Sequence, residues 1–181
     1  MKFKFSEESI FVIKNWEIIQ KLINAEGEIK KDFPKYFNEL KKILQNKEWW
    51  NNNLKFELES DQQAYISIID WKVKGVYVIW IGVEWFIPEN LFGPTGNAIC
   101  YLWVEDNEKI TKIVSDLRSI FKNDDTYGEY IGTEEGYVIK KSLKKYEPDE
   151  IDDFINGAPL EEIATFIGEV YLKIKDYRIP Q

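Results

Sequence analysis

The sequence predicts an α+β domain in which an antiparallel sheet packs against helices. Three apolar runs within residues 64–104 support this prediction, because they are rich in aromatic and β-branched residues and are separated by turn-forming residues. The short connections between these runs favour antiparallel pairing of successive strands. Helical periodicity precedes and follows this region, and no repeat or linker divides the chain. We therefore expect a single α+β domain over residues 1–181, with a four-strand meander and an added hairpin.

Two helices are expected before the sheet. Ser6 is a suitable N-cap for a helix over 7–24, in which apolar residues recur at helical spacing. Gly27 is expected to end that helix. A second helix is expected over 34–46, because its first residue is proline, which suits the first helical position. The asparagines of 47–53 then predict a loop.

Four strands of a meander follow, at 54–60, 64–71, 76–86 and 98–104. The first alternates apolar and charged residues, which is typical of a half-exposed strand near an edge. The third is apolar at both alternating sets of positions, so we expect it at the centre of the sheet with the second and fourth as neighbours. Gly82 within it indicates a bulge or close packing.

The remaining elements come from the same signals. An apolar stripe at helical spacing predicts a middle helix capped by Asp106 or Asn107, and prolines open two helices near the C-terminus. The expected ranges are 110–121 for the middle helix, 129–133 and 137–143 for the hairpin, 148–157 for a short acidic helix and 159–174 for the last helix.

Composition removes several classes of catalytic site. The chain has no histidine, which excludes Ser-His-Asp and Cys-His catalysis and histidine-containing zinc sites. Its single cysteine, Cys100, lies in an apolar run and is expected to be a buried, inert thiol. The net charge of −8, with Arg118 and Arg178 as the only arginines, argues against direct nucleic-acid binding.

The distribution of charged residues also bears on location. Charges interrupt every apolar run before it reaches the length of a bilayer span. Acidic residues come too early in the N-terminal segment for a secretory signal. These patterns predict a cytoplasmic protein with no membrane association.

The sharpest chemical pattern is Asp61 followed by Asp70-Trp71-Lys72. It resembles the PD-(D/E)xK nuclease pattern, in which an acid and a (D/E)xK tripeptide lie on neighbouring strands of a hairpin and hold a magnesium ion. Here the two aspartates would bound one strand and stand about 25 Å apart, too far to share an ion. The remaining nuclease alternative pairs Asp70 and Lys72 with Glu84, or pairs Asp70 with Glu105, across strands.

A simpler interpretation is that Asp70 and Lys72 flank a turn at Lys74-Gly75. A second carboxylate group, Glu84 with Glu105 and Asp106, could serve as acid and base or bind a hard metal. Glu84 interrupts an apolar strand, so it is expected to emerge into solvent or to pair with a lysine. We therefore expect no tight divalent-metal site and no cofactor.

Aromatic residues concentrate in the predicted sheet. Such residues can fill a core, stack bases or sugars, or anchor a protein interface. The group comprises Trp71, Tyr77, Trp80, Trp85, Phe86, Tyr101 and Trp103. Some of the four tryptophans in this group, Trp71, Trp80, Trp85 and Trp103, are expected at a surface as interface anchors.

An acidic run at 147–153 could mimic phosphate spacing, but it also fits a solvated helix start. Taken together, these patterns favour a non-enzymatic protein-binding module of immunity, anti-defence or chaperone-like type. Its partner is expected to be another protein or a second copy of the chain. The alternative is a magnesium-dependent nuclease-like domain that uses Asp70, Lys72 and Glu84.

Overall fold

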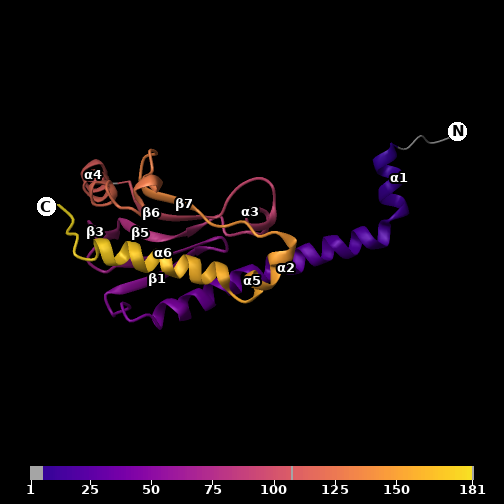
Figure 1. Ribbon diagram of the computed structural model, residues 1–181, viewed down its shortest axis with the longest axis horizontal. Helices are drawn as coiled ribbons and strands as arrows, with labels where there is room; N and C mark the ends of the chain where they lie inside the picture. Colours follow the sequence, from indigo (N-terminus) through magenta and orange to yellow (C-terminus); the bar gives the residue numbers. More distant parts are fainter. Residues whose placement is uncertain (1–5, 107, 181) are drawn as a thin grey trace.

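The computed structural model describes residues 6–106 and 108–180, and it has the expected α+β architecture (Figure 1). Five antiparallel strands form the main sheet in the order β1-β2-β5-β6-β7. Their bounds are Leu54–Ser60 for β1, Gln63–Ile68 for β2, Ile79–Glu84 for β5, Ile99–Val104 for β6 and Tyr137–Ser142 for β7. The apolar strand β5 is therefore central, as its sequence predicts, with β2 and β6 as its neighbours.

The segment between β2 and β5 departs from the predicted strands. The chain turns after Ile68 and forms a small separate hairpin of β3 (Lys72–Val73) and β4 (Val76–Tyr77). Its turn is Lys74-Gly75, as expected, and both residues have positive φ, at 51° and 86°. The predicted strand over 64–71 was too long, because it ends at Ile68 and Trp71 leaves the sheet to insert its indole into the core. The predicted strand over 76–86 was also too long, since Val76–Tyr77 belong to the small hairpin and β5 covers only Ile79–Glu84.

The predicted hairpin at 129–133 and 137–143 forms only in part. Its second half joins the sheet as β7, but its first half is a 3-10 turn, η1 (Gly128–Tyr130), followed by a single bridge between Ile131 and Ile139. The Asp124 side chain favours this turn by accepting the backbone N–H groups of the two residues that precede Gly128, at 3.0 and 2.9 Å.

Three helices cover one face of the sheet. They are α2 (Trp16–Gln45), α4 (Ile110–Phe121) and α6 (Ala158–Ile174). Helix α6 packs on β5 and β6 and also contacts α2 and α4, while α4 packs on β6 and β7. Alternate strand residues such as Ile66, Ile81 and Leu102 meet these helices in the core. Cys100 is buried on this face as a free thiol, as the sequence predicts, and its burial raises the pKa of the thiol.

The shorter elements close the ends of this layer. They are α3 (Pro88–Phe92), a 3-10 turn η2 (Pro148–Glu150) and α5 (Ile151–Ile155). The predicted acidic helix is thus a 3-10 turn continued by a short α-helix, and Gly157 separates it from α6 with a φ of 93°. The N-cap of α4 is Lys109 rather than Asp106, while Asn107 lies outside the described residues.

The N-terminal helices differ most from expectation. The predicted break at Gly27 is wrong: α2 runs through both Gly27 and Pro34, and the chain bends instead at Asn15, after α1 (Glu7–Lys14). The Asn15 side chain donates to the carbonyl oxygen of Phe11 at 2.8 Å and so ends α1. An interior glycine costs a helix only about 1 kcal/mol. Downstream packing on the core, through buried residues such as Phe37 and Leu40, can offset that cost.

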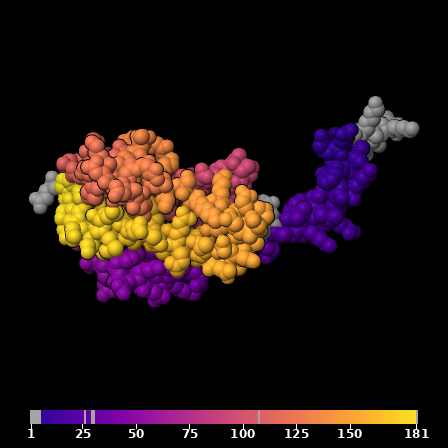
Figure 2. Space-filling view, in the orientation of Figure 1, coloured from indigo at the N-terminus to yellow at the C-terminus, as the bar shows by residue number. Residues whose placement is uncertain are grey.

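Helix α1 and the first part of α2 project from the body (Figures 1 and 2). We call residues 7–25 the arm. It stands clear of the packed layer in the space-filling view, as the indigo segment to the right. No residue of α1 is buried. The arm therefore contributes little to the core that the other elements share.

The first prediction tests the central placement of β5. Ile81 is fully buried and pairs with Ile66 and Leu102. An aspartate in its place would leave an unpaired charge in the core, at a cost of several kcal/mol, comparable with the total free energy of unfolding. We expect Ile81→Asp to be unfolded by circular dichroism. A folded variant with the melting temperature of the wild type would refute the placement.

An ion pair ties the loop after α4 to α6. The Lys173 ammonium donates to Asp124, which also accepts the backbone N–H groups of Thr126 and Tyr127. The Lys173 ammonium, helped by these amides, holds the pKa of Asp124 below its usual value. The pair therefore stabilises the fold only while Asp124 is ionised.

The second prediction follows from this ion pair. Asp124→Asn should lower the free energy of unfolding near neutral pH by about 1 kcal/mol. The folded pKa lies below the unfolded one, so the contribution is complete above about pH 4 and disappears as the pH falls through the folded-state value. Urea unfolding of the wild type and variant across this range measures it. If the double variant loses the sum of the unfolding free energies that Lys173→Met and Asp124→Asn lose singly, the two side chains are not coupled.

Candidate functional site

The carboxylates of the nuclease alternative do not converge. Asp70 lies in the turn that follows β2. The Ser67 hydroxyl donates to the Ile79 carbonyl oxygen at 2.9 Å, so the C-terminal end of β2 lies beside the first residue of β5. Glu84 is the last residue of β5, about 17 Å further along at 3.3 Å per residue. Lys72 instead places its ammonium 4.3 Å from the ring centroid of Tyr77.

The other acidic candidates also lie apart from Asp70. Asp61 is in the turn that joins β1 to β2. Glu105 follows β6, and its backbone N–H donates to the Val78 carbonyl oxygen at 2.8 Å. Within residues 6–106 and 108–180, no three acidic or cysteine side chains are grouped so that they could hold a metal ion.

The sheet face opposite the helices carries the aromatic residues. Strand register places Tyr65, Gly82 and Tyr101 in one row across this face, and Trp80, Trp103 and Tyr137 in the next. Side chains of the first row do not belong to the core cluster on the helical side. We call this surface the open face.

A small hollow lies on the open face. Its volume is about 230 Å³. The lining combines four aromatic rings with three carboxylates and one amide. These residues are Trp80, Tyr101, Trp103 and Tyr137, then Glu59, Glu84 and Glu105, and Gln63.

Hydrogen bonds hold three of the four aromatic side chains that line the hollow. The Trp103 indole N–H donates to Glu105 at 3.2 Å, and the Tyr137 hydroxyl donates to Glu84. The Gln63 amide donates to the Tyr101 hydroxyl at 3.0 Å. Burial and the bond to Glu84 raise the pKa of Tyr137, so this phenol stays neutral in the physiological range. The site is thus built in advance of any ligand.

Gly82 makes this arrangement possible. A β-carbon there would lie 2.2 Å from the Ala64 carbonyl oxygen and 2.7 Å from the β-carbon of Tyr65. Without one, Tyr65 lies over β5 and stacks on Trp80 with ring centroids 4.7 Å apart and an interplanar angle of 12°. The close packing that the sequence suggests at Gly82 is therefore confirmed. The indole Nε1 of Trp80 is buried and has no hydrogen-bond partner among the described residues.

The four candidate interface tryptophans fall into different environments. Trp71 is only 1% exposed and its indole donates to the Tyr177 carbonyl oxygen at 3.3 Å, so it is a core residue and not a surface anchor. Trp80 and Trp103 are half-buried in the hollow. Trp85 is 52% exposed. It stands beside a second, smaller hollow of about 170 Å³ that shares Gln63 and Glu84 with the first.

Trp85 also has an unusual backbone. Its φ is 57°, in the left-handed region that bulky residues avoid. The Asn90 side chain donates to its carbonyl oxygen at 2.9 Å and helps to hold the turn. The Trp85 side chain is exposed and lines the second hollow. Strained residues often coincide with functional sites, which keeps Trp85 as an anchor candidate.

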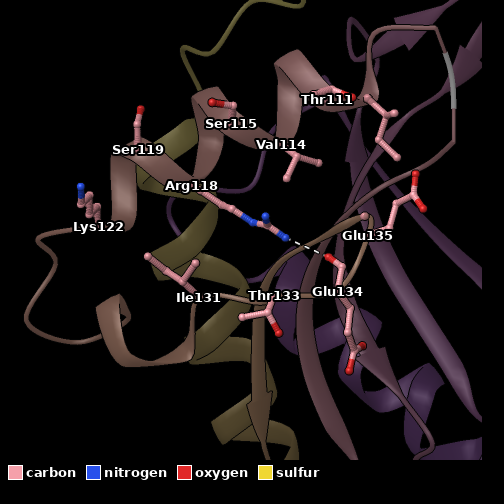
Figure 3. A pocket seen from close by; sticks show the side chains of 12 residues that line it. Thr111, Val114, Ser115, Arg118, Ser119, Lys122, Ile131, Thr133, Glu134 and Glu135 are labelled. Carbon is pink, nitrogen blue, oxygen red and sulfur yellow. Dashed lines mark hydrogen bonds between the residues drawn. The ribbon is translucent and has the colours of Figure 1, made fainter.

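Another cavity, larger than the hollow, lies elsewhere, between α4 and the loop before β7 (Figure 3). It has a volume of about 800 Å³. Arg118 reaches across it and donates to the carbonyl oxygens of Glu134 and Tyr137 at 2.8 and 2.7 Å. Its guanidinium therefore ties this loop to α4. The side chains of Val114 and Ile131 contribute apolar surface to the walls of this cavity.

Sequence reasoning identified part of the hollow. It expected Glu84 to emerge into solvent at a strand end or to pair with a lysine. Glu84 does end β5 and is partly exposed in the hollow, where its carboxylate accepts the Tyr137 hydroxyl. Sequence reasoning did not single out Glu59, Gln63 or Tyr137. The useful signal was the alternation within each strand, since Trp80, Gly82 and Glu84 share one face by their spacing of two residues.

The comparisons with known proteins returned no match. No family model, no curated protein and no solved structure is significantly similar to this chain. Among the residues that the structure describes, no helix combines the length and the apolar character that crossing a membrane requires.

The third prediction concerns the strain at Trp85. Asparagine tolerates the left-handed region and valine does not, so the two substitutions separate backbone strain from the loss of the indole. We expect Trp85→Asn to be at least about 1 kcal/mol more stable than Trp85→Val, by urea unfolding. Equal stabilities of the two variants would show that the turn stores no strain.

Proposed function

We propose that this chain is a non-enzymatic protein-binding module that docks through its N-terminal arm. The observation that carries the proposal is the bare apolar surface of the arm. Its large apolar side chains are 36–65% exposed. They are Ile10, Phe11, Val12, Ile13, Trp16, Ile18, Leu22 and Ile23. So many exposed apolar residues on one projecting element are typical of an interaction site.

The apolar stripe of α2 is covered at one end and bare at the other. Leu22, Phe33 and Leu40 are spaced by nearly whole numbers of helical turns and so lie along one line of the helix. Phe33 and Leu40 are 5% and 0% exposed where they pack on the body, whereas Leu22 is 65% exposed. The same surface that packs on the core downstream thus continues into the arm without a partner from this chain.

A second copy of the chain is the partner that these features favour. Residues 7–17 contain three glutamates and one lysine, whereas the rest of the arm, 18–25, contains one lysine and no acidic residue. An antiparallel pair of arms related by a twofold axis would place the acidic segment of each beside the more basic segment of the other. Mutual burial of the exposed apolar residues would cover on the order of 1,300 Å², within the range of specific interfaces.

Immunity, anti-defence and chaperone-like proteins act by binding other proteins, and such roles would be compatible with a docking arm. The magnesium-dependent nuclease alternative has less support, because Asp70 and Glu84 lie at opposite ends of β5. No geometric feature of the described residues replaces that missing cluster.

The fourth prediction tests the arm in the full chain by sedimentation equilibrium. Leu22→Glu places a charge in the apolar stripe, and Asn24→Glu adds the same residue and charge on the exposed polar face. We expect the wild type and Asn24→Glu to be dimers and Leu22→Glu to be monomeric, since a charge buried between two arms is costly. Both positions are exposed in the protomer, so both variants should fold, and circular dichroism checks this.

Two results would contradict docking through the arm onto a second copy. One is a wild-type protein that stays monomeric at high concentration. The other is a Leu22→Glu variant with the mass of the wild type.

A further inference from the structure

We propose that the hollow on the open face binds an organic ammonium group, supplied by a lysine residue of a peptide or by a small amine. This site is on the sheet and is independent of the arm. The charge and the aromatic walls of the hollow favour such a ligand, and the unpaired indole donor of Trp80 lies beside them.

The charge of the hollow favours a cation. Glu59, Glu84 and Glu105 line it, and no lysine or arginine does. Within the described residues, no ion pair neutralises Glu59 or Glu84, and Glu84 has only the neutral Tyr137 hydroxyl as a hydrogen-bond partner. A bound ammonium would supply the missing positive charge and donate to these carboxylates.

The aromatic walls favour an ammonium over a fully hydrated metal ion. An ammonium within about 6 Å of an aromatic ring centroid is attracted to the ring face. The protein already shows this on the same face, where the Lys140 ammonium stands 4.7 Å from the Tyr137 ring centroid. That lysine is engaged by Glu134 at 2.8 Å and is not part of the lining. Trp80 and Trp103 also line the hollow and are only half-buried, so their accessible ring surfaces can face a second cation.

The hollow is also ordered before binding. Trp103 is held by Glu105, Tyr137 by Glu84 and Tyr101 by Gln63. A ligand therefore meets side chains that are already in place, which reduces the entropic cost of binding. Gly136, with a φ of 82°, gives Trp103 its position, because a β-carbon there would lie 2.5 Å from the indole ring.

The indole N–H of Trp80 is buried and has no hydrogen-bond partner among the described residues, and a small rotation of the ring would let it donate to an acceptor of the ligand. A buried donor without a partner is costly, by about 1–3 kcal/mol, and is uncommon in folded proteins. A lysine residue in a peptide offers both an ammonium and a carbonyl oxygen. The neighbouring hollow beyond Gln63 and Glu84, which reaches Trp85, gives the rest of a peptide a place to lie.

The experiment uses the full chain and follows the indole N–H resonances by NMR. The probes are the capped peptide Gly-Lys-Gly, its norleucine counterpart, which has the same aliphatic stem without the ammonium, and the small amines spermidine and choline. We expect saturable shifts of the Trp80 and Trp103 signals with the lysine peptide and none with the norleucine peptide. Trp80→Phe identifies the Trp80 signal by its loss.

Variants assign the binding to the hollow. Glu84→Gln keeps the shape of the side chain and should weaken binding about tenfold, as expected for loss of a charged hydrogen-bond partner. Glu59→Gln changes an exposed carboxylate at the rim and should weaken it in the same direction without affecting the fold. Glu161→Gln, on α6 and paired with Lys47, has the same charge change outside the hollow and should leave the affinity unchanged.

The outcomes separate the two sources of the ammonium. Tighter binding of the lysine peptide than of either amine would assign a protein ligand, and the reverse would assign a small amine. Equal binding of the lysine and norleucine peptides would overturn the proposal. So would an unchanged affinity in both Glu84→Gln and Glu59→Gln, or no saturable shift with any of the cationic probes.

Discussion

Strand β5 is hydrogen-bonded along both edges, so its side chains must alternate between two faces that cannot be exchanged. One set, including Ile79, Ile81 and Val83, is fully buried against the helices. The other set is Trp80, Gly82 and Glu84, which form part of the open face. A slip of one residue in register would bring Glu84 into the core and Ile81 to the surface. The helical layer and the hollow thus depend on the same register.

Because of this constraint, the sequence predicted the sheet better than the helices around it. Alternation and turn chemistry locate β1, β6 and β7 closely and place β5 at the centre of the sheet, since period-two patterns and Gly-containing turns are local signals. Gly27 and Pro34 are also local signals, but there packing overrides them. The core anchors α2 through Phe33, Phe37, Leu40 and Leu44, so one helix continues where propensity alone favours two.

The sequence predicted a residue of the hollow only where the signal came from residues next to it in the chain. Trp80, Trp103 and Glu84 can be identified in the sequence because they are large aromatic or charged residues within apolar strands. Tyr137 cannot, because its role comes from a bond to a carboxylate 53 positions away and from the pairing of β6 with β7. Trp71 was missed in the opposite sense, because the sequence offered it as a surface anchor and the structure buries it. Its place in the sequence is equivalent to that of the other tryptophans, but the turn after Ile68 directs its side chain into the core.

Helix α1 has eight residues and none of them is buried. Isolated helices of this length are marginal in water, because the cost of the first turn is not recovered by so few hydrogen bonds. Its helical state should therefore depend on whatever covers it, so that folding of the segment and association become one linked equilibrium. In such a system the helix content of the protein would itself vary with its concentration, and the arm would respond to partner abundance without any separate switch.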